Sequence, residues 1–324
     1  MAKRTLDGFF HSPSTKKARL TDRANRVPNE ISEASKHPSY PWAIPYYSPE
    51  VIAELEDLRH KLGKEINDKL DLDLIYFQPF IPKNIEREVF EFLRSNLFFY
   101  RVRYSIKRFG KETQINTPRY TTVFGVDETS RFIAEPPSIV QAADVTTPIP
   151  VQKYRCDPRP IPECLDILRR VTEAATKTKY NFVLVNYYAN GADSISYHSD
   201  DERFLGPEPA IASFSLGAKR DFLMKHKPIP PKNGVTVPEL DPIKLPLQSG
   251  DMVLMRGRTQ SNWLHSIPKR KGVEADKGRL NITLRRALNP GGTENYYRYN
   301  VGGGGVYRWN NKKAEMVPWT PTGP

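Results

Sequence analysis

One seven-residue stretch, Arg279–Arg285, constrains the fold more than any other, because polar and apolar residues alternate along it without interruption. In a β-strand successive side chains point to opposite faces, so the three leucine and isoleucine residues face one side of a sheet. The opposite face carries Arg279, Asn281, Thr283 and Arg285. Arginine is almost never buried without a partner. The stretch therefore predicts a strand whose inner face binds an anion, and a dicarboxylic cosubstrate would satisfy it.

Two histidines and an aspartate form a candidate metal site. His198 and Asp200 follow an apolar strand, and residues two apart on a strand point to the same side. His265 comes after a second apolar strand, Asp251–Met255. Two histidines and one carboxylate form the facial triad of non-haem Fe(II) oxygenases, which leaves three metal positions open. A His-x-Asp pair alone is also common as two polar residues at a strand end, but the later histidine and the Arg279–Arg285 strand make the combination much more specific.

With these residues in this order, the region from about Ile75 to Leu288 resembles the AlkB family of Fe(II)/2-oxoglutarate dioxygenases. It is most similar to the eukaryotic nuclear members that repair alkylated duplex DNA. The resemblance implies Fe(II), 2-oxoglutarate and O2 as cofactor and cosubstrates. It also implies oxidative removal of methyl groups from N1-methyladenine and N3-methylcytosine, with release of formaldehyde.

The resemblance assigns roles to the individual residues. His198, Asp200 and His265 would hold the metal, and Arg279 would pair with the distal carboxylate of 2-oxoglutarate. Arg285 matches the second arginine, nearer the metal-bound end. The same pocket would be lined by Asn186, Tyr188, Asn281 and Thr283. Each of these also has a simpler interpretation as a polar residue on a sheet face.

Acidic residues directly after the metal carboxylate are candidates for the substrate side of the site. Asp201 and Glu202 follow Asp200 without a break. N1-methyladenine and N3-methylcytosine carry positive charge, so nearby carboxylates can orient them. The alternative is that Asp201 and Glu202 pair with Arg203 in a solvated loop.

A basic and aromatic segment is the candidate DNA contact. From Arg94 to Lys111 the chain has six basic residues and no acidic one, interleaved with aromatic residues. Cations neutralise phosphates, and an aromatic wedge fills the gap left by an unstacked base. The segment resembles the base-displacing hairpin of the duplex-specific family members, with candidate residues Arg108, Phe109, Gly110, Lys111 and Arg119. An ordinary solvated hairpin is the alternative. By the same resemblance, Phe124 and Phe132 are candidates for the wall around the flipped base.

The pattern of elements predicts an α+β fold, a double-stranded β-helix (jelly roll) with buttressing helices and a nucleotide-recognition lid. Helices are expected after Ser48, from Pro82 and from Pro162–Glu163. Strands are expected at 74–80, 120–125, 180–188, 210–216, 220–226, 243–247, 251–255 and 280–286. We expect a dioxygenase domain over residues 41–290, with the helical and nucleotide-recognition part in 41–160 and the jelly-roll core in 161–290. Residues 291–324 form a C-terminal extension whose role the sequence does not define beyond strand-like docking or nucleic-acid contact.

Residues 1–40 are rich in Lys, Arg, Ser and Pro and predict a disordered tail. Within it, Leu6, Phe9 and Phe10 resemble a sliding-clamp-binding peptide, although Lys3 replaces the usual leading glutamine. Lys16–Arg19 resembles a nuclear import signal, so a nuclear location is expected.

Composition sets the remaining expectations. The net charge of +12 favours a polyanionic partner but does not separate DNA from RNA. No apolar run approaches 18 residues and no signal peptide is evident, so we expect neither a membrane nor a secreted protein. We also expect a monomer. Cys156 and Cys164 have no metal or redox spacing and are expected to be reduced thiols.

Two alternatives to duplex DNA repair stay open. One is demethylation or hydroxylation of RNA or of a protein side chain by the same chemistry, which the behaviour of the Phe109 hairpin toward duplex DNA would distinguish. The other is a non-catalytic DNA-binding module on the same fold. The presence of all three metal ligands together with Arg279 and Arg285 counts against that second alternative.

Overall fold

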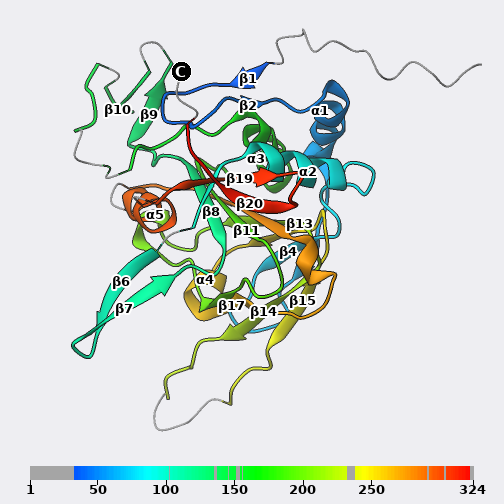
Figure 1. Ribbon diagram of the computed structural model, residues 1–324. Coiled ribbons are helices and arrows are strands. Elements are labelled where there is room, and N and C mark those ends of the chain that lie inside the picture. The colour runs from blue at the N-terminus through cyan, green and yellow to red at the C-terminus, as the bar shows by residue number, and fades with distance from the viewer. Residues whose placement is uncertain are drawn as a thin grey trace, which may run out of the picture. The chain divides into compact units, whose positions relative to one another are not determined.

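Two antiparallel sheets organise the chain, and the alternating strand lies near the middle of the larger one (Figure 1). The computed structural model describes residues 33–321, apart from 102, 135–136, 145, 151–153, 155, 232–237, 290–291 and 303. Residues Glu33–Pro324 form one compact unit. The larger sheet has ten strands in the order β20 (Glu315–Trp319), β19 (Val306–Asn310), β5 (Phe99–Tyr100), β8 (Tyr120–Gly125), β11 (Phe182–Tyr188), β18 (Arg279–Arg285), β13 (Ile211–Gly217), β16 (Met252–Met255), β4 (Leu74–Phe77) and β3 (Lys64–Ile66).

The smaller sheet has four strands in the order β12 (Ile195–His198), β17 (Trp263–Ile267), β14 (Arg220–His226) and β15 (Ile243–Leu247). Side chains from β12, β14 and β17 line the same cavity as side chains from β11, β13 and β18. The cavity therefore lies between the inner faces of the two sheets, as in the jelly roll that the sequence predicted.

Helices cover the larger sheet on its other side. They are α1 (Pro49–Glu56), α2 (Glu86–Asn96) and α3 (Glu163–Thr176). The short helix α4 (Thr259–Asn262) packs on β17, and α5 (Thr293–Asn300) packs on β8 and lines the cavity. Three 3-10 turns lie at Asp57–His60, Arg203–Leu205 and Ala275–Lys277. Helix α2 packs on β13 and β19, and α1 packs on α3. Ser48 caps α1 as predicted, because its hydroxyl accepts the Val51 N–H at 3.3 Å. Helix α2 begins four residues after Pro82, because a turn at 82–85 precedes it.

Three two-stranded hairpins complete the structure. They are β1 (Ala34–Ser35) with β2 (Ile44–Pro45), β6 (Arg103–Arg108) with β7 (Lys111–Asn116), and β9 (Ser130–Ile133) with β10 (Ser138–Gln141). The β6–β7 hairpin projects from the body (Figure 1). Among the described residues, no helix is both long enough and apolar enough to cross a bilayer.

Both ends of the compact unit extend beyond the predicted domain of residues 41–290. At the start, β1 lies within the segment expected to be disordered, and Tyr40 is buried with its hydroxyl donating to the Pro160 carbonyl at 2.5 Å. At the end, β19 pairs with β5 through Val306 and Tyr100, so the C-terminal extension docks as strands on the larger sheet. Apolar residues at these ends, including Tyr297, Val301 and Met316, are buried, which explains why they join the fold.

Candidate metal centre and substrate cavity

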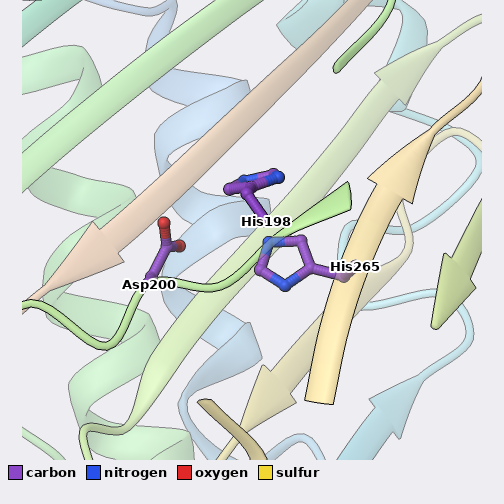
Figure 2. A group of neighbouring side chains, drawn as sticks. All are labelled: His198, Asp200 and His265. Atoms are coloured by element: carbon purple, nitrogen blue, oxygen red, sulfur yellow. The ribbon is translucent and has the colours of Figure 1, made fainter. Parts of the chain in front are cut away.

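The side chains of His198, Asp200 and His265 lie close together (Figure 2). His198 ends β12, Asp200 follows two residues later, and His265 lies in the middle of β17. The two histidines are paired across the strands, which places their ring centroids 4.3 Å apart. One ligand atom from each of the three residues lies within 4.8 Å of the other two. The geometry matches the triad predicted from sequence.

Each histidine has the form that a metal ligand requires. The Nδ1 of His198 is 2.8 Å from the Ser196 carbonyl, which can only accept, so Nδ1 carries the proton and Nε2 is left for a metal. Burial, with a smaller contribution from His198, lowers the pKa of His265 to about 3. The imidazole of His265 is therefore neutral at physiological pH and free to coordinate.

The Asp200 carboxylate is held by Arg285 on the neighbouring sheet. The Nη2 of Arg285 donates to Oδ2 of Asp200 at 2.7 Å, and both side chains are buried. Burial alone would raise the pKa of Asp200, but Arg285 and the two histidines outweigh it, so the pKa falls to about 2. The carboxylate is therefore charged, with one oxygen fixed by Arg285 and the other available to a cation.

The second arginine, Arg279, lies at the other end of β18. It is 1% exposed, and its Nη2 donates to Ser215 Oγ at 2.7 Å. Its guanidinium carbon is 5.3 Å from the Tyr188 ring centroid. The Nε and Nη1 of Arg279 have no hydrogen-bond partner among the described residues, and the same atoms of Arg285 have none either. Buried orphan donors of this kind need an anionic partner, and a dicarboxylate fits both arginines.

A cavity of about 670 Å³ joins these groups. Its walls include every residue predicted to bind metal or cosubstrate, namely Asn186, Tyr188, His198, Asp200, His265, Arg279, Asn281, Thr283 and Arg285. The register explains the grouping, because Asn186 pairs with Asn281 and Tyr188 with Arg279, and paired residues of antiparallel strands share a face. Arg119 also lines the cavity, where its Nε donates to Asn186 Oδ1 at 2.9 Å.

The two acidic candidates have different surroundings. Asp201 is ion-paired with Lys227 at 2.7 Å and does not line the cavity. Glu202 lines the cavity, and its Oε1 accepts from the Tyr296 hydroxyl at 2.8 Å. Its Oε2 is buried and has no partner among the described residues. Neither residue forms the predicted alternative pair with Arg203 in the structure's described part.

The prediction that Phe124 walls the base pocket is wrong. Phe124 pairs with Val183 on β11, one residue out of step with the cavity-facing Leu184 and Asn186, so it points to the opposite side of the sheet. Its ring is fully buried there, 5.5 Å from Phe98. The other aromatic candidate, Phe132, lies on β9 and lines a separate cavity beside α3.

The candidate DNA-contact residues form a hairpin tip. Arg108 pairs with Lys111 across the strands, and Phe109 and Gly110 form the two-residue turn with φ of 48° and 78°. The Phe109 side chain is fully solvent-exposed at 104%. The side chain of Arg108 lies outside the described residues, as do Leu6, Phe9 and Phe10.

Sequence reasoning missed one part of the cavity, which is contributed by α5. Asn295, Tyr296, Tyr299 and Asn300 all line the cavity, although they lie in the C-terminal extension. The available signal was the tyrosine cluster in that extension, because the spacing of Tyr296 and Tyr299 places both on one side of a helix.

The fold and site are those of a non-haem iron oxygenase that uses a 2-oxoacid. A family model described as 2OG-Fe(II) oxygenase superfamily matches residues 74–285. A DNA oxidative demethylase ALKBH2 of Arabidopsis thaliana is 31% identical over 229 residues, which cover 67% of each chain. The Homo sapiens protein of the same name is 40% identical over 134 residues, covering 40% of this chain and 49% of that one.

A third relative, the alkB homolog 3 dioxygenase of Homo sapiens, is 38% identical over 140 residues, covering 42% of this chain and 48% of its own. The chain thus spans about half the length of the human relatives and two thirds of the plant one. It belongs to the 2OG-Fe(II) oxygenase superfamily and, within it, to the AlkB family of dioxygenases. Its cofactor and cosubstrates are accordingly Fe(II), 2-oxoglutarate and O2, and the unpaired nitrogens of Arg279 and Arg285 fit the cosubstrate.

Proposed function

We propose that this dioxygenase is an oxidative DNA demethylase acting on N1-methyladenine and N3-methylcytosine. The observation that carries the proposal is the buried, unpaired Oε2 of Glu202 in the same cavity as the iron ligands. A buried carboxylate oxygen without a partner favours a cationic substrate, and both lesions are cationic bases. Two of the relatives described above are named DNA oxidative demethylases, which supports the same substrate class.

Each cavity residue has a physical task in this reaction. Arg279 binds the distal carboxylate of 2-oxoglutarate, while Arg285 keeps Asp200 charged and fixes its orientation. Glu202 orients the alkylated base, and the apolar walls from Phe222 and Ile267 exclude water. When bound, Fe(II), 2-oxoglutarate and O2 together supply the oxidation that turns an N-methyl group into an N-hydroxymethyl group, which leaves as formaldehyde.

We further propose that the substrate is a base flipped from duplex DNA and that Phe109 is the wedge. A non-glycine residue in the left-handed region costs roughly 1–2 kcal/mol, and exposing a whole phenyl ring adds to that cost. Phe109 carries both costs at the tip of the β6–β7 hairpin. Insertion into a base stack would bury the ring, and Lys111 in the adjoining strand provides a cation for the phosphates. The net charge of +12 is consistent with a polyanionic substrate.

We also propose that the N-terminal segment binds the sliding clamp and carries a nuclear import signal, as the sequence predicts. The basic cluster Lys16–Arg19 and the clamp-like peptide with Leu6, Phe9 and Phe10 would bring a repair enzyme to replicating DNA in the nucleus. Both segments lie outside the described residues.

Formaldehyde release tests the proposed function directly. The full chain is loaded with Fe(II) under anaerobic conditions, oxygen is admitted, and formaldehyde is measured from matched single-stranded DNA, duplex DNA and RNA that carry N1-methyladenine. We expect release from DNA that depends on 2-oxoglutarate, with duplex DNA as a competent substrate. Release from RNA but from neither form of DNA would reject the proposal.

A further inference from the structure

Helix α5 has two faces with different surroundings. Thr293, Tyr297 and Val301 recur every four residues, and all three are buried in the body. The Tyr297 hydroxyl donates to the Gly125 carbonyl at 2.9 Å and accepts the Arg159 N–H at 2.8 Å. These contacts fix α5 against the end of β8. The other side of the helix, with Tyr296 and Tyr299 one turn apart, is thereby turned toward the cavity.

Tyr296 connects α5 to Glu202, the carboxylate proposed to orient the base. Its hydroxyl donates to Glu202, its ring lies 5.6 Å from Phe204 and 5.5 Å from Phe182, and the Arg285 guanidinium lies 5.3 Å from it. Gly292, at the start of the helix, allows this close approach, because a Cβ there would lie 2.0 Å from the Phe204 ring. Helix α5 is therefore seated on the Glu202 side of the cavity.

Tyr299 is the exposed aromatic residue of the cavity. Among the described aromatic residues that line it, Tyr188, Phe204 and Phe222 are each less than 9% exposed, whereas Tyr299 is 46% exposed. The Arg298 guanidinium lies 5.4 Å from its ring centroid, so a cation adjoins the ring. An exposed aromatic ring beside a cation is the combination that binds a nucleobase and its phosphate. The two aromatic candidates from sequence, Phe124 and Phe132, do not reach this cavity.

We propose that helix α5 forms the aromatic wall of the nucleobase site, with Tyr299 stacking on the extruded base opposite the carboxylate of Glu202. The inference rests on the proposed function, because it assigns the base subsite of that same cavity. It places a specificity-determining residue outside the matched family region, which ends at residue 285.

The test compares Tyr299→Ala with Tyr299→Phe, and uses Phe132→Ala as a control at an aromatic residue of the other cavity. The substrate is a single-stranded oligonucleotide with one N1-methyladenine, so that duplex opening does not contribute. Loss of one base–aromatic stack corresponds to roughly a fivefold to a hundredfold change in affinity. We expect Tyr299→Ala to raise KM for the oligonucleotide by that factor and KM for 2-oxoglutarate much less. Tyr299→Phe, which keeps the ring, should stay within about threefold of the wild type, as should Phe132→Ala.

A second readout is equilibrium binding by fluorescence anisotropy with Mn(II) in place of iron. The ratio of affinities for lesion and unmodified oligonucleotides should fall for Tyr299→Ala alone. An unchanged ratio and KM in Tyr299→Ala would overturn the wall assignment, and a larger loss in Phe132→Ala would move the wall to the β9–β10 hairpin. A wild-type enzyme that releases no formaldehyde from any DNA lesion overturns the proposed function itself, and that failure is visible before any variant is compared.

Discussion

Replacing Arg279 with methionine should weaken binding of 2-oxoglutarate without lowering the stability of the fold. Methionine keeps much of the side-chain length and volume but removes the charge. Burial lowers the pKa of Arg279 from its ordinary 12.5 to about 10. At about 1.4 kcal/mol per pKa unit, burial disfavours the charged guanidinium by roughly 3 kcal/mol, and this cost is fully present at neutral pH, where the group is protonated.

Among the described residues, the Tyr188 side chain opposes that cost in the free protein, and so does the hydrogen bond to Ser215 at 2.7 Å. Such a bond contributes roughly 1–3 kcal/mol. The Arg279→Met protein without cosubstrate should therefore be as stable as the wild type or more stable by up to about 2 kcal/mol. Binding changes the other way, because truncating one partner of a buried charge pair costs roughly 2–5 kcal/mol, at least about thirtyfold in Kd.

Thermal unfolding with Mn(II), with and without 2-oxoglutarate, measures both effects. At a hundred times the wild-type Kd, the cosubstrate stabilises the wild type by about 2.7 kcal/mol, and a thirtyfold weaker variant by less than about 1 kcal/mol. The matched control is Arg220→Met, since Arg220 is also buried but donates to the Asp193 and Pro268 carbonyls at 2.8 and 2.6 Å. Arg220→Met should lower Tm and keep the cosubstrate-dependent gain. If Arg279→Met behaves like Arg220→Met, Arg279 is structural and the carboxylate site lies elsewhere.

Three further predictions follow from the site and the tail. His198→Ala and Asp200→Ala should both abolish 2-oxoglutarate turnover, but only Asp200→Ala should lower the free energy of unfolding by roughly 3–5 kcal/mol, because it leaves Arg285 buried and unpaired; equal urea midpoints would contradict this. Phe109→Ala should slow formaldehyde release from duplex DNA by roughly tenfold to a hundredfold and from a single strand only slightly, whereas equal losses would make Phe109 a structural residue. A peptide of residues 1–20 should bind the sliding clamp, and exchange of Phe9 and Phe10 for alanine should remove the binding; a calorimetric titration without heat would reject this.

The metal and cosubstrate site was predictable from the sequence because its residues lie on regular strands, except for Asp200, which follows β12. Along β18 the period of two determines which residues share a face, so the alternation alone assigns Arg279 and Arg285 to one cavity. The strands predicted at 220–226 and 243–247 coincide with β14 and β15. Phe124 was misassigned because the period fixes relative faces within a strand but not which face of β8 looks inward. Only the pairing of Val183 with Phe124 decides that, and it depends on a strand far along the chain.

The substrate side was less predictable because it is built from irregular and distant segments. Glu202 could be named from its place after Asp200, but its partner Tyr296 is 94 residues away in a helix with no marked motif. The turn that carries the proposed wedge, Phe109, was predictable from a local sequence, since Phe109 and Gly110 are the whole turn. Local signals thus identified the parts of the site that local structure determines.

This division has a mechanistic consequence. The residues that would hold the cosubstrate lie on β11 and β18 inside the larger sheet, and His265 lies on β17 inside the smaller one. His198 and Asp200 lie on the edge strand β12 and directly after it. In the proposed function the base would be met by α5 and by the β6–β7 hairpin, which are not part of those strands. Substitutions at Tyr299 or at the hairpin tip are therefore expected to alter the choice of base or strand with little change at Arg279 and Arg285. Because Arg285 holds Asp200 and also lies against the Tyr296 ring, the two parts meet at that one guanidinium. A substitution at Tyr296 is accordingly expected to affect the iron ligand Asp200 through Arg285.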